Sequence, residues 1–505
     1  MSWSVKLKDA LANPPYQWTY LLRTVAVGSA PGGHYIGSSL PGSGYAVIGR
    51  NVRINGASLK YGQWSSTLGS FTVELAGSIQ ILKRSLTRGT FVELLIGRPD
   101  WPDSDYQTIA IGQVQQLSGR SPLLSTLTCR DLLSALRCRP STTAANLALG
   151  YRLDGASATL AHAYAVGDPT MDVNSTTGFE LGSGSGAILV TPASGDDPFI
   201  LRYSGTAHGT ELTGISVAAV HNTVAMAADV GTLIHALYWI EDHPLRAFRR
   251  VLLSVQGTDT NAFDSLPAGD GLALPYEFVD HQDCEAYYVA SDPTLEFEIM
   301  SAEQVDNPIQ WVQSWMAAGG FYLTIRQGRI TGRAAVLSNS VDVYDQGTIT
   351  DDDIEINGVT WEAWDSDTPE EYCTTVVTSN NADSTSAGIE DPATLPATYR
   401  KDYDVTSLLY SLETDGRTGI INRVFEAHQR VPERYTLQLR GLRWAGLAPG
   451  DFVRVTSRQI AGRMVATYDG LNETRAIVTQ VSADFGKGSV SLVVLVFPLT
   501  DVQFP

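Results

Sequence analysis

Four stretches between Val166 and Ala236 carry the plainest structural pattern of the chain: GDPTMDVNSTTGF (167–179), GSGSGAILV (182–190), DDPFILRYSGTAHGTELTGI (196–215) and AADVGTLIHAL (227–237). In each stretch a few alternating apolar residues are bounded by Gly, Ser or Asp, which is the pattern of short antiparallel strands joined by tight turns. No ionisable side chain in them is placed for catalysis. The pattern therefore predicts a small β-module, inserted into the chain at residues 160–237. Its expected strands are Thr170–Val173, Ala187–Val190, Phe199–Tyr203 and Leu212–Ile215.

The length and composition predict several domains, most of them built from strands. A chain of 505 residues is too long for one hydrophobic core, so three or four domains are expected. Val, Thr, Ser and Tyr are frequent and helical patterns are few, which predicts a fold that is mainly β with some α/β. Besides the module, the expected domains are a first β-barrel domain (1–145), an α/β domain (239–337), and a second β-barrel domain (338–505) with a helix and an exposed polar loop at 380–398.

Local signals place the elements of these domains. In FTVELAG, Phe71, Val73 and Leu75 alternate with polar residues, which predicts a strand with one buried face. Pro244 and Pro308 each open an apolar stripe with helical spacing, because proline is tolerated in the first turn of a helix. The remaining expected elements are strands at 46–54, 91–97, 109–117, 124–128, 354–359, 374–379, 434–439, 476–481 and 489–496, a short helix capped by Asp131, a helix at 418–430 and a hairpin with its turn at 326–328.

The acidic charge of the chain is concentrated in one segment. The formal net charge is −19, but residues 251–399 hold 26 Asp and Glu against three basic residues, Arg326, Arg329 and Arg333. Neutralising phosphates needs Lys and Arg, so this segment is not expected to bind nucleic acid. Two interpretations remain open: a surface that only aids solubility, and a surface that repels polyanions, such as the wall of a channel through which DNA slides.

A search for catalytic and metal-binding motifs finds none. The chain has no HExxH, GxSxG, Walker A or GxGxxG sequence and no Cys/His spacing typical of a metal site, so no enzyme activity, cofactor or metal is expected. His281 and Cys284 are close in sequence, but the neighbouring carboxylates would raise the pKa of a thiol, which is wrong for a nucleophile. The simplest interpretation of the four cysteines, Cys129, Cys138, Cys284 and Cys373, is buried thiols in a reducing compartment, and a shared cluster would need all four to converge.

Neither a membrane segment nor a signal peptide is expected. No run approaches about 18 apolar residues, and the first residues, MSWSVKLK, lack an apolar core.

Several weak motifs, in order along the chain, resemble one family. The opening GD…V.STTGF, the YSG…T.LTGI hairpin and the A..VGTLI close of the insertion resemble a small β-module found in many bacteriophage tail proteins. FVELLIG and IGQVQQLSG resemble the first tube-type barrel of phage tail hub proteins. PGDFVRVTS followed by ETRAIVTQVSADFGKGSVSLVVLVF resembles the last domain of the same proteins. These are the baseplate or tail-tip hubs of long-tailed phages and gene transfer agents.

The resemblance implies a structural role. A hub of this family is a homotrimer in which two barrel domains per subunit give a pseudo-hexameric ring that continues the tail tube. Its expected partners are itself, the distal tail protein ring or tail tube protein, the carboxyl-terminal part of the tape-measure protein, and tip or fibre proteins. DNA would pass through the ring without specific binding. The expected location is the tip of a virion tail of the siphophage type, assembled in the host cytoplasm. Some relatives hold an iron–sulfur cluster with cysteines, a feature not carried over because the four cysteines here are dispersed.

Two other functions stay open at this stage. A host-binding adhesin or fibre-type tail protein would be expected to show repeats or a glycan-binding surface, and a tail-associated cell-wall hydrolase would need a catalytic constellation. If the chain forms a hub channel, part of its acidic excess is expected to face the DNA. The candidates cluster around the predicted strands of the last domain and are Asp351, Asp352, Asp353, Glu355, Glu362, Asp365 and Asp367.

Overall fold

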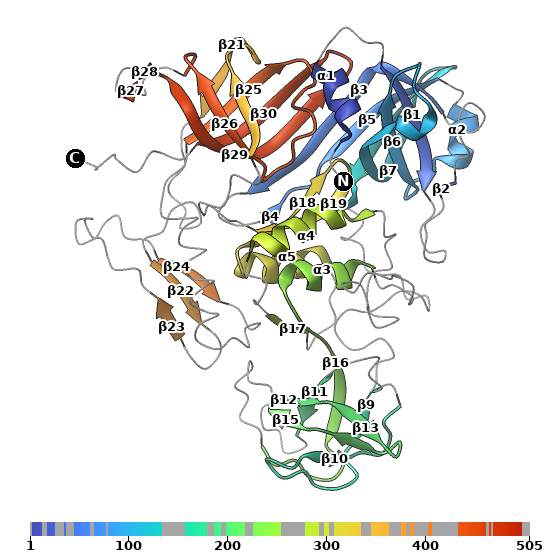
Figure 1. Ribbon diagram of the computed structural model, residues 1–505. Coiled ribbons are helices and arrows are strands. Elements are labelled where there is room, and N and C mark those ends of the chain that lie inside the picture. Colours follow the sequence, from blue (N-terminus) through green and yellow to red (C-terminus); the bar gives the residue numbers. More distant parts are fainter. Residues whose placement is uncertain are drawn as a thin grey trace.

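The computed structural model is built mainly from antiparallel β-sheets, as predicted, with few helices (Figure 1). No helix in the described part of the chain is both long and apolar enough to cross a membrane. The structure describes residues 3–12, 18–25, 35–36, 45–60, 65–76, 79–133, 157–177, 179, 186–192, 198–217, 226–253, 278–291, 297–301, 308–334, 345–362, 375–379, 384–387, 402–406, 433–460, 464–465 and 468–496.

The first strand-rich unit is formed by the amino-terminal part of the chain. Its strands pair in the order β1-β6-β7-β8-β5-β3, and the sheet curls so far that β1 also pairs with β3. In β5 the side chains of Phe71, Val73 and Leu75 are all buried in the core, which confirms the predicted apolar face. The elements are α1 (Val5–Ala12), β1 (Thr19–Val25), β2 (Tyr35–Ile36), β3 (Tyr45–Lys60), β4 (Ser65–Ser66), β5 (Ser70–Ala76), α2 (Ile79–Ser85), β6 (Phe91–Gly97), a 3₁₀ turn (Asp103–Asp105), β7 (Gln107–Ser121) and β8 (Leu124–Asp131).

The last strand-rich unit is formed by the carboxyl-terminal part. Its strands pair in the order β20-β26-β29-β30-β25-β21, all antiparallel except β20 with β26. In β30 the buried Val490, Leu492 and Val494 alternate with less buried residues, as the sequence predicts. The elements are β20 (Asp345–Thr350), β21 (Ile354–Glu362), β25 (Glu433–Arg440), β26 (Phe452–Ser457), β29 (Leu471–Asp484) and β30 (Ser489–Val496), with the small pair β27 (Met464–Val465) and β28 (Tyr468–Asp469).

The two strand-rich units share one sheet. Strand β3 of the first pairs antiparallel with β29 of the last, with Arg53 opposite Asp484 and Asn55 opposite Ser482. Their buried side chains form a single hydrophobic cluster, and Figure 1 shows the units side by side. The two expected β-barrel domains are therefore two units of one continuous sheet. Strands β3 and β29 continue the hydrogen-bonded ladder from one unit into the other, and the two units bury one common core. Among the described strands, β20 and β21 pair neither with each other nor with a common partner, so the last unit is not closed.

An α/β part packs beneath both units. Its helices are α3 (Pro244–Leu253), α4 (His281–Ala290) and α5 (Pro308–Ala318), and its strands are β17 (Phe297–Ser301), β18 (Phe321–Arg326) and β19 (Arg329–Ala334). Helices α3 and α5 begin at the two predicted prolines. Trp315 of α5 is fully buried, so the aromatic stripe belongs to the core. Helix α4 was not predicted.

The inserted module is a separate small β-fold at the end of Figure 1 opposite the shared sheet. Its buried residues, among them Phe179, Ile188 and Tyr203, form a hydrophobic cluster of their own. All four predicted strands are present. The elements are β9 (Ser157–Thr159), β10 (Thr170–Asp172), β11 (Gly186–Thr191), β12 (Phe199–Tyr203), β13 (Gly205–Ala207), β14 (Glu211–Thr213), β15 (Ser216–Val217) and the first half of β16 (Leu233–Asp242).

Strand β16 links the module to the α/β part without interruption. Residues 233–237 pair with β9 and β11 of the module, whereas Tyr238–Asp242 pair with β17. The expected boundary between residues 237 and 239 thus lies in the middle of a continuous strand, at the point where its partners change.

Excising the module is expected to leave the rest of the protein folded. Replacing residues 157–237 with a short Gly/Ser linker removes the module's own hydrophobic cluster and keeps the β16–β17 pairing from Tyr238 onward. The free energy of unfolding of the remainder should change by less than about 1 kcal/mol, which is about 1 °C in the unfolding temperature of a chain of this size. Calorimetry of the shortened and full-length chains measures this. A remainder without a cooperative transition would mean that the module is part of the folding unit.

Some predicted elements differ from the structure or lie outside its described part. The expected loop at 380–398 contains strand β23 (Ser384–Ala387), which pairs with β22 (Thr375–Ser379), itself parallel to β24 (Asp402–Thr406). Asp131, expected to cap a helix, is the last residue of β8, and its carboxylate accepts a hydrogen bond from the backbone N–H of Gly69. Leu132 and Leu133, which follow it, form a 3₁₀ turn, and the rest of the expected helix lies outside the described residues. The expected helix at 418–430 lies outside the described residues.

Candidate functional site

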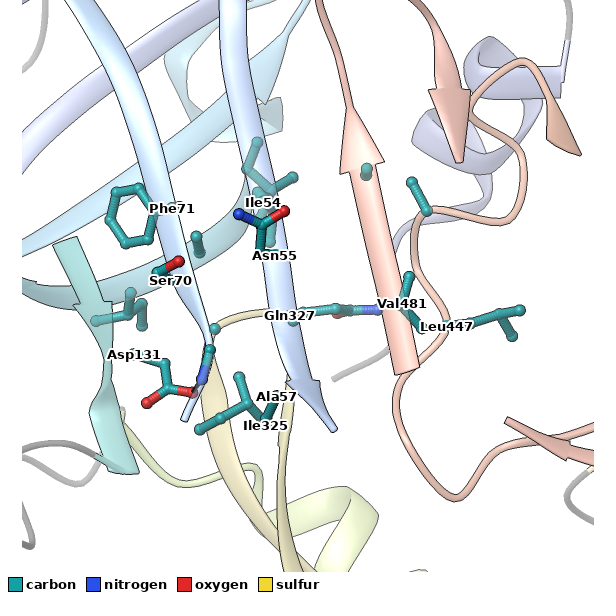
Figure 2. A pocket seen from close by; sticks show the side chains of 18 of the residues that line it. Ile54, Asn55, Ala57, Ser70, Phe71, Asp131, Ile325, Gln327, Leu447 and Val481 are labelled. Atoms are coloured by element: carbon teal, nitrogen blue, oxygen red, sulfur yellow. Dashed lines mark hydrogen bonds between the residues drawn. The ribbon is translucent and has the colours of Figure 1, made fainter. Parts of the chain in front are cut away.

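The β18–β19 hairpin places its tip where the two strand-rich units meet. Gln327 and Gly328 form the turn, with positive φ angles of 50° and 80°, as a two-residue type I′ turn requires. A Cβ at Gly328 would lie 2.6 Å from the carbonyl carbon of Ala110 in β7, so the tip touches the backbone of the first unit. Figure 2 shows the side chain of Gln327 pointing toward Val481 and Leu447 of the last unit. The hairpin therefore contacts both units at once.

A small cavity surrounds this tip. Its volume is about 60 Å³, and the described residues that line it are mostly apolar and come from both units and the hairpin. Asp131 is the one charged residue among them, and its carboxylate is bonded to Gly69. Small-molecule sites usually measure about 300–1,000 Å³. The cavity is therefore a packing feature of the junction and too small for a substrate.

A buried ion-pair network fixes the hairpin to its neighbours. Arg333 of β19 is fully buried, and its guanidinium lies 2.8 Å from Asp283 of α4 and 2.9 Å from Asp451, which precedes β26. It also donates a hydrogen bond of 3.1 Å to the carbonyl of Pro449. Arg326 forms a second ion pair with Asp283, to which Thr331 donates a hydrogen bond of 2.9 Å. One arginine thus joins a helix of the α/β part to the turn that starts β26 in the last unit.

The pKa directions agree with a permanently charged network. Burial raises the pKa of Asp283, but the positive charges of Arg333 and Arg326 outweigh burial and hold that pKa below its usual value. For Arg333, burial lowers the pKa, whereas Asp283 and Asp451 raise it well above its usual range. The carboxylate and the guanidinium therefore stabilise each other's charged form. The role of this ion-pair network is structural, because its groups stay charged.

Cys284 has the surroundings of a structural thiol. It is buried in α4 beside Thr331, and burial raises its pKa to about 11, an effect that the nearby charge of Arg249 only partly offsets. Reactive thiols have lowered pKa values, whereas this pKa is raised mainly by burial, and the neighbouring carboxylate of Asp283, the cause that the sequence suggested, contributes less. Burial also raises the pKa of Cys129. Cys138 and Cys373 lie outside the described residues, within which no group of three or more metal-ligating side chains is present.

The acidic candidates divide into bonded and exposed residues. Asp351 accepts hydrogen bonds from the Ser457 hydroxyl and from the backbone N–H of Arg458, the latter at 3.0 Å. Asp353 accepts a bond of 3.0 Å from the backbone N–H of Thr350 and lies 3.6 Å from Arg443. These two carboxylates hold the turn between β20 and β21.

The other candidates are less engaged or are not described. Asp352 and Glu355 are exposed to solvent. The backbone of Glu362 ends β21, and Asp365 and Asp367 lie outside the described residues. The structure thus gathers Asp351, Asp352, Asp353 and Glu355 around one turn and one strand.

The ion-pair network around Arg333 was not predicted from the sequence. Arg333 was identified only as one of three basic residues in an acidic segment, and Asp283 is one of the carboxylates next to Cys284. The one available signal was compositional, because a basic residue in an apolar hairpin, within a segment that is otherwise strongly acidic, needs a carboxylate partner when it is buried. The identity of that partner could not be read from the chain.

Comparisons with known proteins find similarity only among solved structures. No family model matches the sequence, and no curated protein matches it. The fold is similar to the 43 kDa tail protein of prophage MuSo2 from Shewanella oneidensis, at 8% identity over 94% of this chain and 98% of that one, with a TM-score of 0.38. It is similar to prophage tail protein gp18 from Listeria monocytogenes EGD-e, at 6% identity over 96% of each chain, with a TM-score of 0.37.

A third similarity covers a smaller part of the chain. It is to a chain in the virion of a native gene transfer agent particle, at 16% identity over 46% of this chain and 84% of that one, with a TM-score of 0.18. The solved structures similar to this chain thus include two prophage tail proteins and a component of a gene transfer agent virion.

Proposed function

We propose that this chain is the structural hub of a phage tail tip or baseplate, where three copies form a ring that continues the tail tube and its DNA channel. The observation that carries the proposal is the shared sheet. Two strand-rich units from opposite ends of the chain lie side by side, joined through β3 and β29. Three such chains would supply six units, which is the number that a pseudo-hexameric ring needs.

The junction supports this role because a ring requires a fixed angle between the two units of each subunit. The hairpin tip at Gly328, the cluster around Arg333 and the common hydrophobic core all hold that angle. A protein that had to withstand strain along a tail would gain from such bracing. The module, held on strand β16 away from the shared sheet, is suited to reach outward from the ring (Figure 1).

The proposed partners follow from the position at the tail tip. On one side the ring would meet the distal tail protein ring or the tail tube protein, with the tape-measure protein ending inside, and on the other it would anchor tip or fibre proteins. DNA would pass without specific binding, and the subunits would assemble in the host cytoplasm before entering the virion. No catalytic step is proposed for this chain.

The oligomeric state tests the proposal directly. Mass photometry of the purified protein is expected to show a species of about three times 54.5 kDa, because six strand-rich units close the ring. Electron microscopy of the same sample should show rings with a central opening. A protein that stays monomeric or dimeric at micromolar concentration, also with its tail partners present, would contradict the hub.

A further inference from the structure

A buried histidine lies where the strand of the inserted module enters the α/β part. His243 follows the last residue of β16 and precedes α3, and its side chain is 1% exposed (Figure 1). Its ring is nearly perpendicular to the rings of Tyr288 in α4 and Phe321 in β18, with centroids 4.9 and 5.2 Å away. The imidazole is therefore enclosed by two neighbouring elements and removed from water.

The hydrogen bonds of both ring nitrogens fix where the proton of His243 lies. The backbone N–H of Leu245 donates to Nδ1 at 3.1 Å, so Nδ1 carries no hydrogen. Nε2 lies 3.2 Å from the hydroxyl oxygen of Ser291, whose own hydrogen is donated to the carbonyl of Tyr288 at 3.0 Å. The Ser291 oxygen therefore accepts from Nε2, and the network assigns a neutral ring with its hydrogen on Nε2.

These bonds join the start of one helix to the end of another. His243 caps α3, because Nδ1 accepts a backbone N–H of the first turn, which the helix itself cannot satisfy. Ser291 ends α4, and its backbone N–H donates to the carbonyl of Tyr287 at 2.8 Å. We call the bonds from Leu245 through the His243 ring to Ser291 the histidine bridge.

The charges around the ring have both signs. On the neighbouring residues of β16, α3 and α4, the charged and titratable groups are Asp242, Arg246 and Tyr288, and one turn further along the helices Arg249 and Glu285 lie 3.6 Å apart. From β18 the uncharged Phe321 faces the ring. A carboxylate favours a charged imidazole and a guanidinium opposes it. Since Asp242 and Arg246 act in opposite directions, the hydrogen bonds of the bridge decide.

A second proton on the ring is incompatible with the histidine bridge. A charged imidazole carries a hydrogen on both nitrogens, so Nδ1–H would point at the backbone N–H of Leu245. A histidine released from the bridge, in contrast, takes up a proton near pH 6.5. The closed bridge is therefore stable above about pH 6.5, and below it the open form gains a proton that the closed form cannot hold.

We infer that the histidine bridge opens in mild acid and loosens the base of the inserted module. Opening uncaps α3 and separates it from the end of α4. Helix α3 packs against β16, the strand that carries the module, so the support of this strand weakens with it. The module is thus held firmly at neutral pH and is freer to reorient in acid. A single chain contains the whole bridge, so the inference holds with or without the ring of the proposed hub.

Hydrogen exchange of the intact protein, corrected for the intrinsic effect of pH, tests the bridge. Between about pH 7.5 and about pH 5.5 the opening equilibrium of α3 is expected to rise about tenfold, because one proton is taken up over the last pH unit. Residues 238–242 of β16 should follow. Strands β11 and β12 in the module core and β30 in the last unit should keep their protection.

Two substitutions to asparagine provide the variant and its matched control. His243→Asn keeps a good cap for α3 but carries no titratable group, so the change with pH is expected to fall below about twofold. His208→Asn removes an exposed histidine of the module, at a φ of 54° that asparagine also adopts, and should keep the tenfold rise. A wild type without the rise, or a rise that persists in His243→Asn, overturns the inference.

If His243→Asn does not fold, the wild-type histidine rings decide. Nuclear magnetic resonance of isotope-labelled histidine follows the protonation of each ring with pH. Protonation of His243 that coincides with the loss of protection in α3 supports the bridge. A His243 ring that becomes charged near pH 6.5 while α3 stays protected overturns it, because the closed structure would then hold the second proton.

Discussion

Replacing Arg333 with alanine is expected to lower the free energy of unfolding by about 3–5 kcal/mol, because two buried carboxylates lose their common partner. Asp283 and Asp451 lie 2.8 and 2.9 Å from the guanidinium, and all three side chains are buried. The substitution also removes the donor to Pro449. Arg326 still reaches Asp283, whereas Asp451 loses its ion pair and keeps the hydrogen bond of 2.7 Å from the backbone N–H of Ala448. The loss should be felt in both parts that the arginine joins.

Hydrogen exchange combined with calorimetry measures this loss. Faster exchange is expected in α4 and around residues 449–451, together with a lower unfolding temperature. Arg443→Ala is the matched control, because Arg443 is 55% exposed and its pair with Asp353 is 3.6 Å long. Exposed pairs contribute about 0–1 kcal/mol, so this variant should stay close to the wild type. Equal effects of the two substitutions would show that the buried network does not hold the parts together.

The elements that sequence analysis found are those with local signals. Helices α3 and α5 begin at Pro244 and Pro308 because a proline at the first helical position and an apolar stripe occur within a few residues of each other. The β18–β19 hairpin was found because the polar turn Arg326-Gln327-Gly328 separates two short runs that are typical of strands. Such patterns depend only on neighbouring residues.

Helix α4 was missed because its buried face is polar. Its buried residues are Asp283, Cys284 and Tyr287, so the apolar stripe that usually identifies a helix is absent. Asp283 is buried because Arg333 approaches from β19, fifty residues later in the chain. Predicting this helix would require knowing that Arg333 is the tertiary partner of Asp283.

The shared sheet lay beyond prediction for the same reason. β3 and β29 pair across more than 400 residues, and each strand alone fits equally well in a closed barrel. The acidic candidates show the same limit: the sequence identified the cluster at Asp351–Glu355, but the bonds of Asp351 to Ser457 and of Asp353 to Thr350 depend on folding. Only the structure separates the two turn-forming carboxylates from the two exposed ones.

Replacing Gly328 with alanine is expected to displace the hairpin tip from the first unit and to cost about 2–4 kcal/mol of stability. Two effects add. Gly328 has a φ of 80°, which side chains other than glycine rarely adopt, and the new methyl carbon would lie 2.6 Å from the carbonyl carbon of Ala110. Backbone in a paired strand cannot move aside as a flexible side chain can. The tip would therefore retreat and loosen the junction.

Gly488→Ala separates these two effects. Gly488 lies in the turn between β29 and β30 with a φ of 67°, and a Cβ there would meet nothing within 4 Å. It should show only the conformational cost, about 1–2 kcal/mol. The difference between the variants, measured by thermal unfolding, then reports the contact of the tip with β7. Increased hydrogen exchange at residues 108–112 is expected in Gly328→Ala alone. If both variants lose the same stability and residues 108–112 stay protected, the hairpin tip does not brace the first unit, and the angle between the two units must be held by the β3–β29 ladder and the common core.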